Sequence, residues 1–147
     1  MTFSTKNRKT TAAHELALAV VYQSGWLHLA DTAATYTNLP VGRDFLKQVP
    51  ADWDEMRLLG GYPAQWTCIA RRKGDAWFIG MNNAGVGRTL HVPLGFLSRG
   101  NYTLDLYKDG TVADSITYTM STVKSRDAID INVPANGGFA ARLVPVR

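Results

Sequence analysis

From Trp66 onward, hydrophobic and polar positions alternate with a period of two. In the run from Trp66 to Asn83, two such segments flank Lys73-Gly74-Asp75, a turn signal short enough to close a hairpin. This alternation is what a half-buried antiparallel strand requires. We expect eight short strands, at 55–60, 65–72, 76–82, 88–94, 102–108, 115–122, 128–133 and 138–144. Short strands separated by turn signals predict an antiparallel β-sandwich or barrel.

The same alternation predicts which side chains face the core. Trp66 and Trp77 fall in step with the hydrophobic set, so we interpret them as core residues. Exposed and coplanar, some of the aromatics Trp26, Trp53, Tyr62, Trp66 and Trp77 would instead offer a surface for stacking on sugar rings. Four inward-facing sets are expected: Tyr102, Leu104 and Leu106; Ile116, Tyr118 and Met120; Ile129, Ile131 and Val133; and Phe139, Ala141 and Leu143.

The first 52 residues follow a different pattern. Residues 1–10 are polar and predicted to be loose, and Thr10 or Thr11 can cap a helix over 12–23. Residues 26–30 form a short apolar run, either a buried strand or a helix extension, and two short helical segments follow before Pro50. Helix, buried strand and more helix within 50 residues is typical of an α/β unit. We interpret this segment as the last unit of a larger α/β body.

The predicted helix at 12–23 is apolar nearly all round, which indicates burial on more than one side. A segment of this size cannot cover its own apolar surface. The helix is therefore expected to pack back onto the sandwich, or to leave an exposed patch through which the chain self-associates.

Composition excludes several classes of protein. Hydrophobic residues make up 46% and charged residues 19% of the 147 residues, as in a folded domain. The net charge of +4 comes from scattered Lys and Arg, without the basic stripe of a nucleic-acid-binding protein. No apolar run approaches the roughly 18 residues of a membrane-spanning helix, and the N-terminus lacks the apolar core of a signal peptide. The single cysteine, Cys68, excludes an intrachain disulfide and is interpreted as a small buried hydrophobe.

The densest acidic group is 52–55, in which Trp53, Asp54 and Glu55 are the candidate substrate-binding residues. Paired carboxylates can act as acid and base in glycoside hydrolysis when they lie about 5–10 Å apart across a substrate. Neighbours on an extended chain point to opposite sides, however, so Asp54 and Glu55 are poor partners. The alternative is a capped start of the first strand, with ion pairs to Arg57.

The histidines show no zinc-site spacing. His14, His28 and His91 lack an HExxH pattern and cysteine companions. We interpret His14, at the start of the predicted helix, as a hydrogen-bonding residue inside the fold.

Several blocks of the sequence, in order and with matching spacing, resemble the C-terminal end of glycoside hydrolase family 97, the bacterial α-glucosidases and α-galactosidases. The first include Ala13-His14-Glu15-Leu16-Ala17-Leu18 and Asp44-Phe45-Leu46-Lys47-Gln48-Val49-Pro50. They continue through Trp53-Asp54-Glu55, Arg57-Leu58-Leu59-Gly60, Ala70-Arg71-Arg72-Lys73-Gly74-Asp75 and Gly137-Gly138-Phe139-Ala140.

The resemblance implies a domain organisation. Family 97 enzymes combine an N-terminal β-supersandwich, a catalytic (β/α)₈ barrel and a C-terminal antiparallel β-sandwich. Residues 1–52 would then be the C-terminal remnant of the barrel, and 53–147 the sandwich. The fold class expected is mainly β: an eight-stranded antiparallel sandwich preceded by a short α/β remnant.

The resemblance also implies what the chain does. The family's catalytic carboxylates and calcium-ligating glutamates lie upstream, so no catalytic or metal-binding residue is expected here. The chain is expected to be an accessory part of a longer, periplasmic or extracellular enzyme, with the rest of the barrel as its partner and no hydrolase activity alone. The alternatives are a module that binds α-linked glycans, and an enzyme active through Asp54 and Glu55 or through a partner chain.

Overall fold

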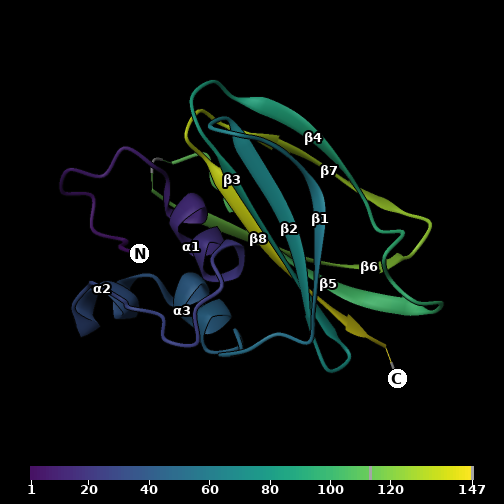
Figure 1. The fold of residues 1–147 in the computed structure, drawn as a ribbon. Coiled ribbons are helices and arrows are strands. Elements are labelled where there is room, and N and C mark those ends of the chain that lie inside the picture. Colours follow the sequence, from purple (N-terminus) through teal and green to yellow (C-terminus); the bar gives the residue numbers. More distant parts are fainter. Residues whose placement is uncertain (113, 147) are drawn as a thin grey trace.

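Three helices are followed by eight strands in the computed structural model, which describes residues 1–112 and 114–146 (Figure 1). The helices are α1 (Ala12–Val21), α2 (Ala33–Asn38) and α3 (Pro40–Leu46). The strands are β1 (Glu55–Tyr62), β2 (Trp66–Lys73), β3 (Ala76–Asn83), β4 (Arg88–Pro93), β5 (Asn101–Asp109), β6 (Ile116–Lys124), β7 (Ala128–Val133) and β8 (Gly138–Pro145). All eight predicted strands are confirmed, with small shifts at their ends.

The strands form two antiparallel sheets. One has six strands in the order β1-β2-β3-β8-β5-β6, and the other consists of β4 and β7. In Figure 1 the β4–β7 pair lies over one face of the large sheet, and the helices lie on its other face. The antiparallel β-sandwich expected from the sequence is therefore present, with a helical layer added to its outer face.

Two hydrophobic clusters hold these layers together. The cluster between the sheets contains Trp77 and Cys68, with Trp66 packed against it at partial burial. It also contains three of the four sets expected to face inward, although Leu106 is only partly buried. The second cluster joins the helices to the large sheet through residues such as Leu16, Phe45 and Phe78. The core assignment of both tryptophans is confirmed.

Helix α1 packs back onto the large sheet, the first of the two outcomes expected for it. Its N-cap is Thr11, whose hydroxyl accepts a hydrogen bond from the backbone N–H of His14 at 3.2 Å. The helix lies against β3, where Gly80 allows it to approach closely: a Cβ there would lie 2.7 Å from the carbonyl oxygen of Ala17. Because Gly80 has no side chain, the backbone of α1 can lie close to the sheet at this point.

The remaining set expected to face inward, that of Ile116, Tyr118 and Met120, is wrong for two of its members. Tyr118 and Met120 are 44% and 68% exposed, while Ile116 packs against the helical cluster. The strand that carries them, β6, lies at the edge of the large sheet. The alternation identified one face of this strand correctly, but within the described residues no element covers that face at Tyr118 and Met120.

The segment before β1 also differs from expectation. Residues 26–30 form neither strand nor helix, and Trp26 is 77% exposed. The α/β pattern expected for the first 52 residues is therefore absent, and three helices with connecting loops take its place. Residues 1–10, expected to be loose, are held by a polar network described below.

Candidate functional site

The acidic residues before and within β1 are neutralised by neighbouring cations. The Asp54 carboxylate accepts hydrogen bonds from the Gly74 backbone N–H at 2.7 Å and from Lys73 Nζ at 3.2 Å. Glu55 accepts from Arg57 Nε at 2.7 Å and from Arg72 Nε at 3.0 Å. These contacts favour the ionised forms.

The pKa values of both carboxyls are correspondingly lowered. The hydrogen bond from Gly74 is the main cause at Asp54, and that from Arg72 is the main cause at Glu55. A general acid must keep a proton near the working pH, which requires a raised pKa. This geometry is that of an ion-paired turn at the start of a strand, as in the alternative interpretation from the sequence, and the contact between Arg57 and Glu55 is present.

Trp53, the third candidate, packs into the fold. Its ring lies edge-on to that of Phe78, with 5.3 Å between centroids, and it borders the cluster under the helices. Its ring is therefore engaged in packing and offers no free platform for a sugar.

The three histidines lie apart in different settings. His14 Nδ1 lies 3.1 Å from the carbonyl oxygen of Gly137, to which it donates, and this confirms its role inside the fold. His28 stacks on Trp26, and His91 contacts Asp130 on the exposed β4–β7 pair. Within the described residues, no three His, Cys, Asp or Glu side chains come together in a group that could hold a metal ion. Across the same ranges, no helix is long and apolar enough to cross a membrane.

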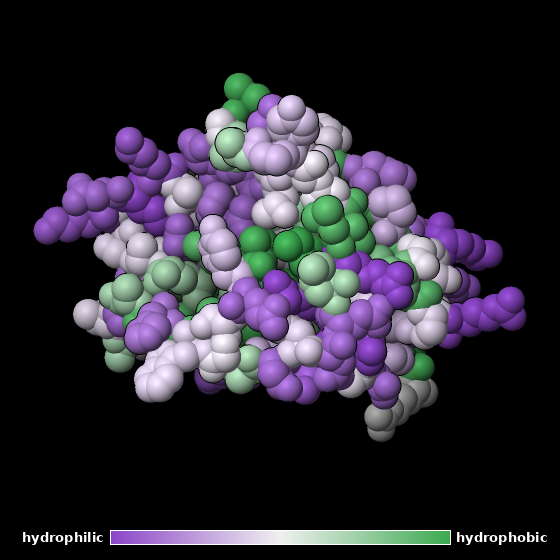
Figure 2. Space-filling model, viewed as in Figure 1, coloured by the Kyte–Doolittle hydropathy of each residue, from purple (hydrophilic) through white to green (hydrophobic). Residues whose placement is uncertain are grey.

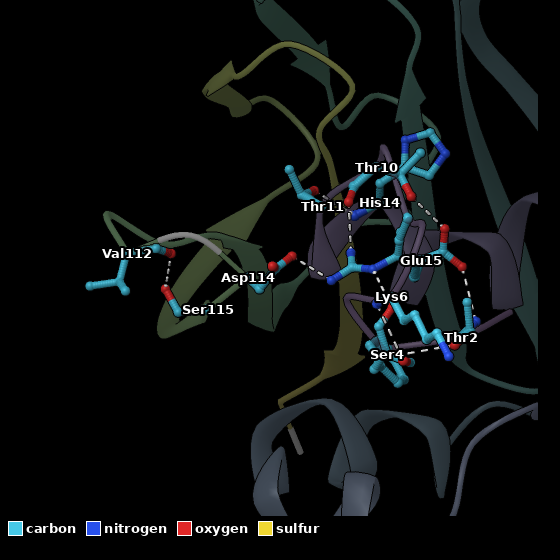
Figure 3. A network of polar contacts seen from close by, with 12 residues as sticks. Thr2, Ser4, Lys6, Thr10, Thr11, His14, Glu15, Val112, Asp114 and Ser115 are labelled. Atoms are coloured by element: carbon cyan, nitrogen blue, oxygen red, sulfur yellow. Dashed lines mark hydrogen bonds and ion pairs between the residues drawn. The ribbon is translucent and has the colours of Figure 1, made fainter.

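A polar network fixes the N-terminal segment over the start of α1 (Figure 3). Glu15, in the first turn of the helix, accepts from the Thr2 backbone N–H at 3.0 Å and from the Thr10 hydroxyl at 2.6 Å. The Arg8 guanidinium donates to the Thr10 carbonyl oxygen at 2.8 Å and pairs with Asp114 next to β6. Through these contacts a polar segment without helix or strand is joined to α1 and to the residues before β6.

An apolar groove of about 520 Å³ lies between α1 and the β1–β2 pair. Tyr22 at the end of α1 and Leu58 and Tyr62 on β1 line it and are exposed, Leu58 by 67%. Figure 2 shows hydrophobic side chains gathered on this face, between α1 and the first strands, with hydrophilic side chains around them. A contiguous exposed apolar surface of this kind marks an interaction site.

One buried polar atom borders the groove. Asn82 on β3 donates from Nδ2 to the His14 carbonyl oxygen at 2.8 Å, while its Oδ1 has no hydrogen-bond partner among the described residues. Sequence reasoning did not find this groove, because its lining comes from residues far apart in the chain. The available signal was Leu58, an apolar side chain on the same face of β1 as Met56.

A family model described as "Glycosyl-hydrolase 97 C-terminal, oligomerisation" matches residues 52–144. Among curated proteins, a probable retaining alpha-galactosidase of Streptomyces bingchenggensis is 43% identical over 129 residues, which are 88% of this chain and 20% of that protein. The retaining alpha-galactosidase of Bacteroides thetaiotaomicron is 31% identical over 137 residues, 90% of this chain and 21% of that protein. The chain thus spans about a fifth of the length of these relatives.

The fold agrees with these matches. A glycoside hydrolase family 97 enzyme from Pseudoalteromonas sp. strain K8, solved in complex with acarbose, superposes with a TM-score of 0.89 at 30% identity. The superposition covers 96% of this chain and 24% of that enzyme. Helical layer and sandwich are therefore found together in that enzyme, since the match extends beyond the sandwich alone.

Proposed function

The chain belongs to glycoside hydrolase family 97, with residues 52–144 as its C-terminal oligomerisation domain, and from this premise we propose that it serves an enzyme that hydrolyses α-galactosides. The support is the name carried by both curated relatives. Residues 1–52 would be the C-terminal end of the catalytic barrel, and residues 53–147 would be the C-terminal β-sandwich of the enzyme. The same proposal places the enzyme in the periplasm or outside the cell.

In this proposal the chemistry belongs to residues upstream of this segment. The carboxylates of Asp54 and Glu55 are held ionised by their hydrogen bonds, and they are committed to Lys73, Arg57 and Arg72. Any calcium would also be held upstream, because the described residues do not offer a set of ligands that fits it. The chain alone is expected to be inactive.

The contribution of this segment is a docking surface for the catalytic domain. The observation that carries this is the groove lined by Tyr22, Leu58 and Tyr62, which leaves large apolar side chains in water. Covering such surface is favourable by roughly 25 cal/mol per Å². A barrel helix packed beside α1 would fill the groove, since α1 is the element through which the chain would continue the barrel.

A chimeric enzyme tests this role. The C-terminal fifth of the Streptomyces relative is replaced by the matching residues of this chain, and hydrolysis of p-nitrophenyl α-galactoside and thermal stability are measured. The chimera is expected to be active, and Leu58→Lys to lower its melting temperature because a charge is placed in the buried groove. The matched control is Val112→Lys, at an exposed valine between β5 and β6 that does not line the groove. Equal melting temperatures for the two variants would contradict docking through the groove.

Binding of α-linked glycans is the second candidate, and it has a narrower basis. Of the aromatics proposed for stacking, Trp66 and Trp77 pack in or against the core and Trp53 packs against Phe78. Trp26 and Tyr62 remain, 77% and 62% exposed. Affinity electrophoresis in starch tests it: retardation that Tyr62→Ala abolishes would favour glycan binding, and unchanged mobility would reject it. Self-association through α1 itself has less support, because seven of its ten residues are buried.

A further inference from the structure

The edge strand β6 lacks the devices that normally protect the edge of a sheet. It runs for nine residues in unbroken register with β5, and from Ile116 to Val123 it carries no charge and no proline. Seven of its nine residues are exposed. A long, regular and uncharged edge presents a row of free N–H and C=O groups on which another strand can pair.

The register defines which backbone groups are free. Gly110 N donates to Ser115 O at 3.0 Å, and these residues continue the pairing of Asp109 with Ile116. Because the ladder alternates, Thr117, Thr119 and Ser121 direct their backbone groups toward β5. Those of Tyr118, Met120 and Thr122 therefore point to the open edge.

The free edge has a defined end. The outward N–H of Lys124 is already satisfied, because it donates to Asp127 Oδ2 at 2.7 Å. At the other end, Ile116 packs against the helical cluster. The segment open to pairing is centred on Met120.

The other edges of the two sheets are protected. On β1, Glu55 and Arg57 carry charges, and the register is broken between Leu58 and Gly60. On β4 and β7, Pro93 ends one strand and Asp130 places a charge in the other. Such charges, prolines and irregularities prevent pairing between molecules. The strand β6 differs from these edges in having no such feature from Ile116 to Val123. This difference indicates that another strand covers the edge of β6.

We propose that β6 pairs with β6 of a second copy of this chain, antiparallel about a two-fold axis at Met120, so that the two six-stranded sheets become one. This deepens the oligomerisation role of the domain and rests on it. A two-fold axis at this point pairs the free segment with itself and opposes Tyr118 with Thr122, so that no like charges meet.

The exposed side chains of β6 fit the same arrangement. Tyr118 and Met120 lie on the helical face of the sheet, next to Tyr107, whose ring centroid is 5.1 Å from that of Tyr118. Across the axis, the two Met120 side chains would lie on the same face and cover each other. The exposure that contradicts the prediction of an inward-facing set is thereby explained by a partner.

Sedimentation velocity over a range of concentrations tests the pairing in the whole chain. A dimer is expected. Met120→Lys opposes two charges across the axis and should weaken dimerisation about tenfold or more, because like charges facing each other are strongly unfavourable. Met120→Pro removes an outward N–H without touching the ladder to β5 and should weaken it similarly. Val86→Lys is the matched control, and circular dichroism checks that all variants are folded.

Oxidative crosslinking locates the axis. Met120→Cys would bring two thiols together at a hydrogen-bonded pair, with about 5.5 Å between Cα atoms, a separation that a disulfide spans. A covalent dimer from Met120→Cys but not from Val86→Cys supports the proposal. A monomer at all concentrations, or a dimer unaffected by both substitutions at Met120, overturns it.

A dimer lost with Leu58→Lys instead would also overturn it and would place the interface at the groove. The proposed enzyme role is judged separately, by the hydrolysis measured with the chimera.

Discussion

Arg71 Nε, on β2, lies 2.7 Å from the carbonyl oxygen of Val20 in the last turn of α1. Its Nη2 contacts the carbonyl oxygen of Val21 at 3.2 Å, and the side chain is buried. The last carbonyl groups of a helix have no partner within it and form the negative end of its dipole. Arg71 thus donates hydrogen bonds from the sheet to the last carbonyl groups of α1, and these bonds connect the helical segment to the sandwich.

Replacing Arg71 is therefore expected to loosen the helical layer. Arg71→Met leaves buried carbonyl oxygens without donors and should lower the free energy of unfolding by about 2 kcal/mol or more. Urea denaturation monitored by tryptophan fluorescence measures this change. Arg57→Met is the control, since Arg57 makes an exposed ion pair worth about 1 kcal/mol or less. Equal effects of the two substitutions would show that the contact to the helix end is unimportant.

Gly80 provides a second test of how α1 is seated. A Cβ at this position would lie 2.7 Å from the Ala17 carbonyl oxygen and 2.8 Å from Val20 Cβ. Gly80→Ala must displace the helix, and overpacking of this kind costs about 1–3 kcal/mol. Gly95→Ala, where a Cβ would meet no atom within 4 Å, is the control. An unchanged denaturation midpoint for Gly80→Ala would contradict the close contact.

The raised pKa of Asp109 should be visible in the pH dependence of the free energy of unfolding. Burial raises its pKa above the usual 3.8, although the hydrogen bond from Gly138 N acts in the opposite direction. The folded state therefore holds this proton more tightly than the unfolded state. The resulting stabilisation is complete below pH 3.8 and is lost as the pH rises through the raised folded-state pKa. Asp109→Asn should remove this loss, so that the variant gains stability relative to the wild type across that interval.

Asp31 gives the opposite sign and serves as the comparison. Burial tends to raise its pKa, but hydrogen bonds from Thr2, Phe3 and Ser4 outweigh it, and the net pKa is lowered. Its stabilisation is present above pH 3.8 and is lost as the pH falls through the folded-state value. Asp31→Asn should therefore cost stability at neutral pH and little at acid pH. Parallel pH profiles for the two variants, from urea midpoints, would contradict these assignments.

Cys68 should be inert in the folded protein. Burial raises the pKa of its thiol to about 12, so almost no thiolate forms at pH 8, and the thiolate is the reactive species. We expect no reaction with Ellman's reagent in buffer and one equivalent in denaturant. Rapid reaction in buffer would mean that the sheet opens readily at β2.

The sequence predicted the sandwich well because strand and turn signals are local. The alternation around Lys73-Gly74-Asp75 is sufficient to define two strands and the residues on each face. It does not say whether a face is covered, which depends on sheet order. The exposure of Met120 follows from the position of β6 at the edge, a consequence of β8 pairing between β3 and β5.

The candidate site was harder to predict for the same reason. Asp54 and Glu55 drew attention as a local acidic cluster, but their partners Arg72 and Lys73 come from the next strand. The groove brings Tyr22, Leu58 and Asn82 together from three elements. Its existence depends on how α1 sits on the sheet, and that in turn depends on Gly80 and Arg71.

Hydrolysis of p-nitrophenyl α-galactoside and α-glucoside by the purified 147-residue chain, with and without calcium, tests the account most directly. The account predicts no turnover under any of these conditions, because the catalytic groups would lie upstream. Calcium-dependent turnover that survives rigorous purification would contradict it. Loss of that turnover in Asp54→Ala or Glu55→Ala would then place the chemistry within this chain.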